Sequence, residues 1–206
     1  MLLAFETDTE PFAVKRDAAV VKHAQKANVA VIQEYSNTVY IPELIVAKNK
    51  GSVPMTYQKF LSVASELRVV VPEGNPKKVT AKNKPPLDAE EKIDEECYDV
   101  PTLEELGVNE YDVSNESLFP GGETEALRRL KDKMKDVKWV CEFEKPKTSP
   151  NSLEPSTTVL SPYLKFGCLS SRLFHQNLKE VYKGRKHSQP PISLEGQLMW
   201  REFYYT

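Results

Sequence analysis

The 206-residue sequence has few cysteines and no long apolar run, and each shortage excludes a class of protein. The three cysteines, Cys97, Cys141 and Cys168, are odd in number, widely spaced and without a Cys-x-x-Cys pair, which argues against a disulfide framework and against a zinc site. No apolar run approaches the roughly 20 residues of a membrane-spanning helix, and Glu6 and Asp8 come too early for a secretory signal. We therefore expect an intracellular protein, nuclear or cytoplasmic, with no membrane contact and no secretion.

Common catalytic signatures are also missing. The sequence contains no Walker loop, no G-x-G-x-x-G, no G-x-S-x-G and no H-E-x-x-H, which excludes the common hydrolases and NTPases. The histidines His23, His175 and His187 have no partner at metal or triad spacing, so we expect them at surface or capping positions and expect no metal site.

Charge is distributed unevenly along the chain. Residues 1–127 hold 13 basic and 22 acidic side chains, whereas residues 128–206 hold 15 basic and 8 acidic ones. The formal net charge of −2 therefore hides an acidic first part and a basic second part. A basic surface can face the phosphates of a nucleotide or a nucleic acid, although solvent-exposed lysines produce the same excess.

Residues 1–72 have the pattern of an α/β unit. Strands are predicted over 2–5 and 29–32, and helices over 15–27 and 56–67. This alternation is typical of the end of a parallel-sheet domain, but it is too short for a complete doubly wound fold. We therefore expect further strands before Met1, so that the chain is truncated at its amino end.

Residues 73–122 are predicted to be an interdomain linker. The segment is rich in proline and acids, and residues 88–125 contain 14 acidic side chains with Lys92 as the only basic one. Such a composition buries too little apolar surface to order itself firmly. Within it, residues 100–106 are predicted to form one helical turn with Thr102 as its cap.

Residues 123–206 are predicted to be all-helical. Helical periodicity is found over 123–135, 169–182 and 193–205. In the first of these helices four apolar residues share one predicted stripe: Ala126, Leu127, Leu130 and Met134. The last helix has no glycine stop and no closing proline, so we expect the natural chain to continue beyond Thr206.

A first candidate binding site precedes the predicted helix at residue 161. Ser161 is predicted as the N-cap and Pro162 as the first helical residue, with Thr157 and Thr158 just before them. Hydroxyls and free amides at a helix start favour an anion such as a diphosphate. A plain helix cap is the alternative explanation of the same residues.

Basic side chains offer further contacts to a phosphate. Lys145 and Lys147 lie on the loop that leads to this cap, although loop lysines are often only solvated. Arg201, in the last helix, carries a guanidinium that can bind a phosphate or carboxylate through two hydrogen bonds. An ion pair with Glu202 explains Arg201 equally well.

The last predicted helix carries an aromatic ring and an amide on one face. Two faces are expected: Gln197, Trp200, Arg201 and Tyr204 on a binding face, and Leu194, Leu198 and Tyr205 on a packing face. Trp200 beside Gln197 gives a ring and an amide that together can grip the face and the edge of a nucleobase. A tryptophan buried in the core is the alternative.

Four segments resemble the cryptochrome/photolyase family in residues, order and spacing. They are residues 119–127, 143–147, 156–170 and 196–203. Residues 5–17 resemble the later part of the antenna domain of that family, and residues 144–148, 154–161 and 187–191 are most similar to its (6-4) photolyases. In one departure, Asn37 stands where the family usually has histidine.

The resemblance implies a fold and a cofactor. The implied fold is an α/β remnant (1–72, the end of a parallel-sheet antenna domain), then a linker (73–122) and the first part of an all-α FAD-binding domain (123–206). The implied FAD-binding residues are Lys145, Thr157, Thr158, Val159, Leu160, Ser161, Gln197 and Arg201. A second antenna chromophore, of folate or deazaflavin type, is left open.

The resemblance also implies an activity. It implies a light-dependent lyase that repairs UV-damaged DNA by photoinduced electron transfer to a pyrimidine photoproduct, with Gln197 and Trp200 at the lesion. Catalytic residues cannot be assigned, because those of the family lie in later helices. The alternatives are a cryptochrome that acts in blue-light or circadian signalling through protein partners, and an inactive partial chain. We expect a monomer, and we do not expect the 206 residues alone to suffice for activity.

Overall fold

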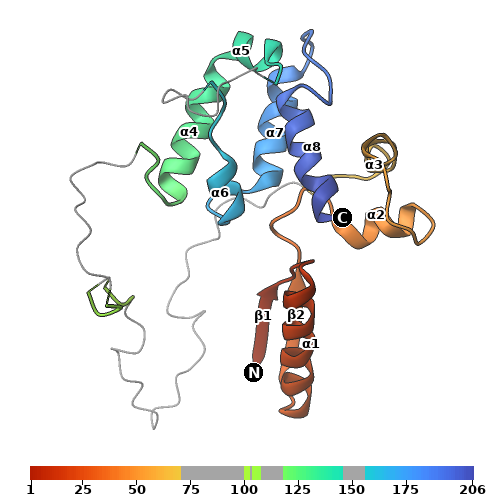
Figure 1. Cartoon of the computed structure of the whole chain (residues 1–206), viewed down its shortest axis with the longest axis vertical. Helices are drawn as coiled ribbons and strands as arrows, with labels where there is room; N and C mark the ends of the chain where they lie inside the picture. The colour runs from red at the N-terminus through yellow and green to blue at the C-terminus, as the bar shows by residue number, and fades with distance from the viewer. Residues whose placement is uncertain (71–99, 103, 108–117, 146–155) are drawn as a thin grey trace. The chain divides into compact units, whose positions relative to one another are not determined.

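The structure is a computed structural model that describes residues 1–70, 100–102, 104–107, 118–145 and 156–206 (Figure 1). The chain divides into two compact units, one made of Met1–Pro72 with Gly121–Thr206 and the other of Glu73–Pro120. The division of the first unit into an α/β domain and a helical domain stays a prediction.

The first unit begins with a β–α–β element. β1 (Leu2–Glu6) and β2 (Ala30–Glu34) pair in parallel, so that Leu2 lies opposite Ala30. α1 (Pro11–Lys26) connects them and begins at Pro11 rather than at the predicted residue 15, because the fixed φ of proline suits the first turn of a helix. The predicted strands and the parallel sheet are confirmed.

Two short helices follow this element. α2 (Pro42–Lys48) was not predicted from the sequence, since its seven residues are too few to show a clear helical period. α3 (Tyr57–Ala64) lies where a helix was predicted and ends earlier, at Ala64. Its N-cap is Thr56, whose hydroxyl accepts a hydrogen bond from Lys59 N at 3.2 Å.

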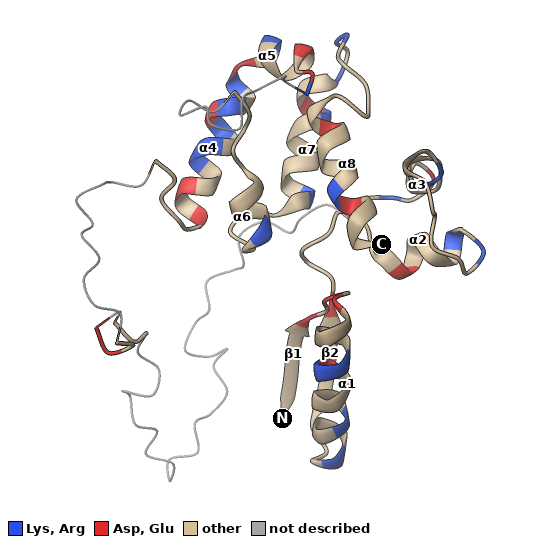
Figure 2. Cartoon of the chain, viewed as in Figure 1, with Lys and Arg blue, Asp and Glu red and all other residues tan. Residues whose placement is uncertain are grey.

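α4 (Glu123–Lys135) has the bounds that its periodicity predicts. Ala126, Leu130 and Met134 are buried, whereas Leu127 is 39% exposed. The buried row follows positions i, i+4 and i+8, and Leu127 lies at the edge of the predicted stripe, about 60° from Leu130 around the helix, where it stays partly in solvent. Figure 2 shows acidic residues in the first turn and basic residues further along α4, an order that suits the helix dipole.

The remaining helices are α5 (Val137–Glu142), α6 (Ser161–Lys165), α7 (Ser171–Tyr182) and α8 (Leu194–Tyr205). Serine side chains cap the two longest of them. Ser170 Oγ accepts from Leu173 N at 3.3 Å, and Ser193 Oγ accepts from Gly196 N at 3.0 Å. These caps lie within the ranges predicted for both helices and satisfy main-chain donors that a helix start leaves free.

One hydrophobic core joins these helices. Its buried members come from α2 to α8, from their connections and from Val39 after β2, and include Ile45, Phe60, Leu130, Val140, Leu160, Leu178, Leu194 and Leu198. Within the described ranges, β1, α1 and β2 contribute no residue to it. In this part of the chain, no helix combines the length and the apolar character needed to cross a membrane.

The described part of the second unit contains the predicted turn. Thr102 Oγ1 accepts from Glu105 N at 3.2 Å, while Glu105 Oε2 accepts from Thr102 N at 2.7 Å. This reciprocal pair is a capping box, so the prediction that Thr102 caps a turn is confirmed.

Candidate functional site

The predicted anion site lies in the loop that enters α6. Val159 has a left-handed φ of 53°, and Leu160, with φ −94° and ψ −7°, is already helical and only 1% exposed. The carbonyl of Leu160 accepts from Leu164 N at 3.0 Å, so Leu160 is the N-cap residue. The prediction that Ser161 caps α6 is wrong, because Ser161 is its first helical residue and is exposed. Burial of Leu160 in the core, rather than a hydroxyl cap, sets where this helix begins.

The shortness of α6 limits what its amino end can offer to an anion. The helix has 5 residues, so few peptide dipoles add along its axis, and Pro162 has no N–H to donate. Thr157 is half-buried and Thr158 is buried just before it. Anion binding in this loop would therefore rest on main-chain N–H groups and threonine hydroxyls more than on the helix dipole.

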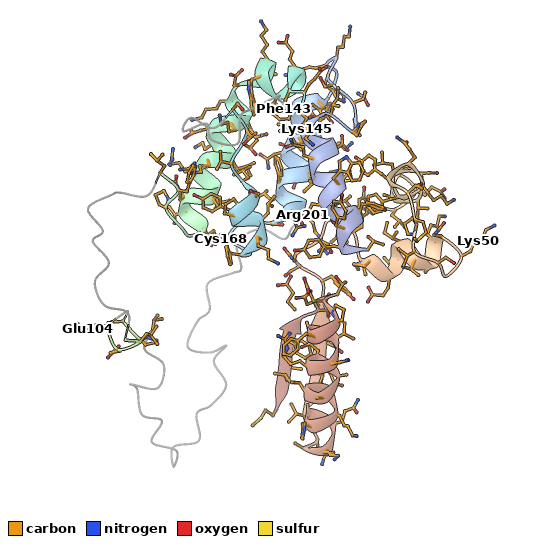
Figure 3. All side chains as sticks on the ribbon, viewed as in Figure 1. Lys50, Glu104, Phe143, Lys145, Cys168 and Arg201 are labelled. Atoms are coloured by element: carbon orange, nitrogen blue, oxygen red, sulfur yellow. The ribbon has the colours of Figure 1, made fainter. Side chains whose placement is uncertain are left out.

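The main chain of Lys145 is hydrogen-bonded to the segment before α8. Its N–H donates to Ile192 O at 2.8 Å. The Lys145 side chain is exposed, and Figure 3 shows it near Phe143, just after α5. Lys147, the second predicted lysine, lies outside the described residues.

Gln197 and Trp200 lie on α8 in different surroundings. Gln197 is half-buried, and its side-chain amide makes no hydrogen bond to any other residue that the structure describes. Trp200 is half-buried and stacked on Tyr57 of α3, with ring centroids 4.0 Å apart and ring planes 6° from parallel. One face of the indole is therefore covered by protein, and a ligand can use only the remainder of the ring.

Arg201, also on α8 (Figure 3), has several protein partners. Its Nη1 donates to Asn37 O at 3.0 Å and to Glu202 Oε1 at 2.8 Å, and its Nη2 donates to Asn37 Oδ1 at 2.6 Å. The guanidinium carbon also lies 4.5 Å from the centroid of the Tyr205 ring. The ion pair considered for Arg201 is thus present, and the guanidinium is directed to the segment that follows β2.

Glu202 is a buried acid that was not among the predicted site residues. It is 2% exposed, and its Oε2 accepts from Val39 N at 2.6 Å and from Tyr40 N at 3.4 Å. Burial raises the pKa of Glu202, and Arg201 together with the two N–H donors offsets only part of that rise. A sequence signal was available, because Glu202 follows Leu198 by four positions and so shares the packing face of α8.

Residues 35–40, which follow β2, are also held by α7. Donors in its first turn bond three carbonyls of the segment: Arg172 Nε to Thr38 O at 3.0 Å, Arg172 Nη2 to Tyr35 O at 2.5 Å, and Ser171 Oγ to Asn37 O at 3.0 Å. Buried carbonyls outside regular structure need such partners. The segment is therefore fastened to the start of α7 and to the last turns of α8.

A second, partly buried ionic cluster lies at the first turn of α8. Glu195 Oε1 accepts from Lys179 Nζ at 2.5 Å and lies 3.6 Å from His175 Nε2. Burial raises the pKa of Glu195, but hydrogen bonds from His175 and Lys179 outweigh it and bring the pKa to about 2. His175 is buried, so the expectation of a surface or capping position is wrong for this histidine, which packs between α7 and α8.

A crevice of about 330 Å³ opens at the carboxyl ends of β1 and β2. Its lining includes Arg16, Asn37, Lys165 and Tyr205, and none of the residues predicted to bind FAD. Ligands of α/β domains commonly bind at this edge of a parallel sheet.

Metal ligands and paired cysteines are not found in the described ranges. No group of three or more His, Cys, Asp or Glu side chains there is placed to hold a metal ion. Cys141 and Cys168 are both unpaired, and Cys97 lies outside the described residues.

Known proteins with similar sequences identify the family. The family model described as DNA photolyase matches residues 2–80. A (6-4)DNA photolyase of Oryza sativa subsp. japonica is 46% identical over 206 residues, and Cryptochrome-1 of Spalax judaei is 45% identical over 207 residues, each match covering 99% of this chain. The chain belongs to the cryptochrome/photolyase family.

This cryptochrome/photolyase chain spans only part of its relatives. It covers 36% of the length of the rice protein and 35% of the Spalax protein. A crystal structure of a bacterial class III photolyase from Agrobacterium tumefaciens superposes on 99% of this chain with a TM-score of 0.59 at 18% identity, and the match covers 40% of that protein. At this identity the likeness shows the fold alone. The predicted fold class, an α/β part followed by the helices of this family, is confirmed.

Proposed function

We propose that this chain contributes to a light-dependent DNA repair photolyase of the (6-4) type, which reverses UV-induced pyrimidine photoproducts by photoinduced electron transfer. The partner is then UV-damaged DNA, met in the nucleus. The similarity to the rice (6-4)DNA photolyase supports the type of enzyme. The packing of the predicted binding residues supports a shared site.

That packing is the observation that carries the proposal. Leu160, inside the predicted FAD-binding loop, belongs to the same hydrophobic core as Leu194 and Leu198 of α8, the helix that carries Gln197. The main-chain bond from Lys145 N to Ile192 O joins the loop after α5 to the segment before α8. Residues far apart in the sequence are thus carried by elements that pack together, as one binding site requires.

FAD fits these residues in part. The left-handed turn at Val159 and the threonines before it offer amides and hydroxyls suited to phosphate oxygens, and the Gln197 amide has both a donor and an acceptor to offer. Arg201 does not fit as a phosphate ligand while it holds Asn37 and Glu202. We therefore assign seven residues to FAD: Lys145, Thr157, Thr158, Val159, Leu160, Ser161 and Gln197.

Each side chain of the site has a distinct role in this proposal. When bound, reduced FAD supplies the light-driven electron for repair. Gln197 binds the edge of the lesion or of the cofactor, and Trp200 offers its uncovered face to a base turned out of the DNA helix. Arg201 anchors α8 to residues 35–40, and so keeps Gln197 and Trp200 in position.

The crevice at the strand ends is the proposed place for an antenna chromophore of folate or deazaflavin type. Its volume lies at the lower end of the range usual for small-molecule sites. Arg16 and Lys165 bring positive charge to its lining, and Glu6 and Asp8 bring negative charge, so polar contacts rather than a net charge would orient such a pigment.

A cryptochrome that signals in blue light through protein partners is the second candidate. The 45% identity to the Spalax Cryptochrome-1 favours it almost as strongly as the rice relative favours repair. Both candidates use the same flavin site, so activity on DNA separates them.

The deciding experiment uses the protein expressed from its complete gene. An oligonucleotide with a single (6-4) photoproduct is incubated with the protein in blue light or in the dark, and the remaining lesion is measured by chromatography. We expect repair in the light only. Gln197→Leu should lower the repair rate by about tenfold or more, because a buried polar contact to the flavin or the lesion is lost.

Gln176→Leu is the matched control, since Gln176 lies on α7 and is bonded to Glu180 Oε1 at 3.3 Å. It should leave the repair rate unchanged. A flavin-loaded preparation that repairs nothing in blue light would contradict the proposal and favour the signalling candidate.

A further inference from the structure

Tyr57 covers one face of Trp200 from a different part of the chain. Tyr57 is the first residue of α3, and it is 7% exposed. Its ring lies parallel to the indole, with the 4.0 Å centroid separation given above. The two residues are 143 positions apart, so the contact is made by tertiary packing of α3 against α8.

The hydroxyl of Tyr57 fixes the other end of this ring. It donates to Gly196 O at 3.1 Å in a buried setting, one turn before Trp200 on α8. Burial, assisted by the charge of Glu195, raises the pKa of Tyr57 to about 12. The hydroxyl therefore remains a hydrogen-bond donor throughout the neutral pH range. Tyr57 thus contacts α8 twice, through the stack of its ring on Trp200 and through the hydrogen bond of its hydroxyl to Gly196 O.

Other rings restrict the indole further. Phe203 presents an edge to both rings, at 6.2 Å from Tyr57 and 5.8 Å from Trp200. Phe60, fully buried on α3, lies 5.8 Å from Phe203 and does not stack on the indole. Tyr204, with its centroid 5.9 Å from that of Trp200 and the ring planes 28° apart, also stacks on the indole and is itself 78% exposed. The indole is thus held by neighbouring rings, and it remains only half-buried.

We propose that Tyr57 is a positioning residue for the DNA lesion. By covering one face of Trp200 and tying itself to Gly196, it fixes the plane in which the opposite indole face meets an extruded pyrimidine. Stacking on an already oriented ring avoids the ordering cost that a freely rotating side chain imposes on binding. This inference rests on the proposed function and adds a residue of α3 to the lesion site.

A first measurement establishes the stack in solution. In a Trp139→Phe background, Trp200 is the only tryptophan of these 206 residues, and its near-ultraviolet circular dichroism reports whether the ring is held. Tyr57→Phe keeps the ring and should keep the signal, whereas Tyr57→Leu should reduce it strongly. Phe60→Leu, on the same helix but away from the indole face, should lower the unfolding temperature and leave the signal in place.

A second measurement tests the positioning role in the protein expressed from its complete gene. Binding of an oligonucleotide with one (6-4) photoproduct is compared with binding of the same oligonucleotide undamaged. Tyr57→Leu should weaken binding of the damaged DNA by about three- to tenfold, which corresponds to the interaction free energy of one aromatic pair. It should leave binding of undamaged DNA unchanged. Tyr57→Phe should bind the damaged DNA within about twofold of the unmodified protein, because it retains the stack.

The outcomes separate this role from a structural one and from the proposed function. Two results would overturn the positioning role while the photolyase proposal stands. In the first, Tyr57→Leu weakens binding of damaged and undamaged DNA equally. In the second, Tyr57→Leu loses the circular dichroism signal of Trp200 but keeps its preference for damaged DNA. If the unmodified protein shows no preference for damaged DNA, both fall together. If Tyr57→Leu does not fold, Tyr57→Met replaces it in the circular dichroism and DNA-binding measurements, because the unbranched methionine side chain adapts to the space left by the ring.

Discussion

The β1–α1–β2 element and the helices α2 to α8 are held together by different means. In the first, a parallel main-chain ladder joins two strands, and apolar side chains such as Leu2, Phe12 and Ile32 remain exposed. In the second, apolar side chains from the seven helices α2 to α8 fill one core. The stability of the helices therefore depends on side-chain burial, whereas that of the strands depends mainly on backbone pairing.

The connection between the two regions combines polar bonds with the burial of Val39 in the core. Residues 35–40 are bonded by Ser171 and Arg172 of α7 and by Arg201 and Glu202 of α8. Such bonds are directional, so they fix the position of the segment, and removing one partner leaves buried polar groups unsatisfied. The two regions can thus differ in their sensitivity to mutation while α8 stays aligned with the segment after β2.

The largest expected effect is in the helical core. Leu178→Ala removes a side chain that is 0% exposed and should lower the free energy of unfolding by about 2–5 kcal/mol, because a cavity is left behind. Urea denaturation followed by circular dichroism measures the change. Ile32→Ala, at an exposed position of β2, should cost less than about 1 kcal/mol. Similar losses for both variants would remove the distinction between the regions.

A smaller loss is expected at the polar connection. Glu202→Ala leaves Arg201 and the N–H groups of Val39 and Tyr40 without their acceptor, and should cost about 2–4 kcal/mol in unfolding free energy. Glu202→Gln should cost less, because the amide oxygen still accepts one bond and burial already favours the uncharged form.

Glu180→Ala, at an exposed position of α7, is the control for this pair and should change stability by less than about 0.5 kcal/mol. The measurement is again urea denaturation. If Glu202→Ala matched the control, the contact between α8 and residues 35–40 would contribute nothing to stability.

The smallest expected effect depends on pH. The pKa of Glu195 is lowered from 4.5 to about 2 in the folded chain, so its contribution is present above pH 4.5 and is lost as the pH falls toward 2. Glu195→Gln should therefore flatten the fall in melting temperature over this range, whereas Glu180→Gln should leave it unchanged. An identical pH profile for Glu195→Gln and the unmodified chain would rule out this coupling to His175 and Lys179.

Local patterns predicted most of the regular structure and part of the site. The stripe of α4, the alternation of strands and helices before residue 70 and the helical periodicity over 169–182 and 193–205 are local signals, and the structure has elements at each. α2 and α5 were missed because each is shorter than two helical periods. Ser161 was placed wrongly at the start of α6, because a capping hydroxyl is a local preference and burial of Leu160 overrode it.

Tertiary packing decided which side chains are free to bind and which are not. Arg201 and Trp200 have the composition of a binding face, yet Asn37 holds the first and Tyr57 covers one face of the second. The bond between Val39 N and Glu202 joins residues 163 positions apart. A periodic pattern tells which residues of a helix face the same way, but the partner on that side comes from a remote segment, and only the folded chain brings the two together.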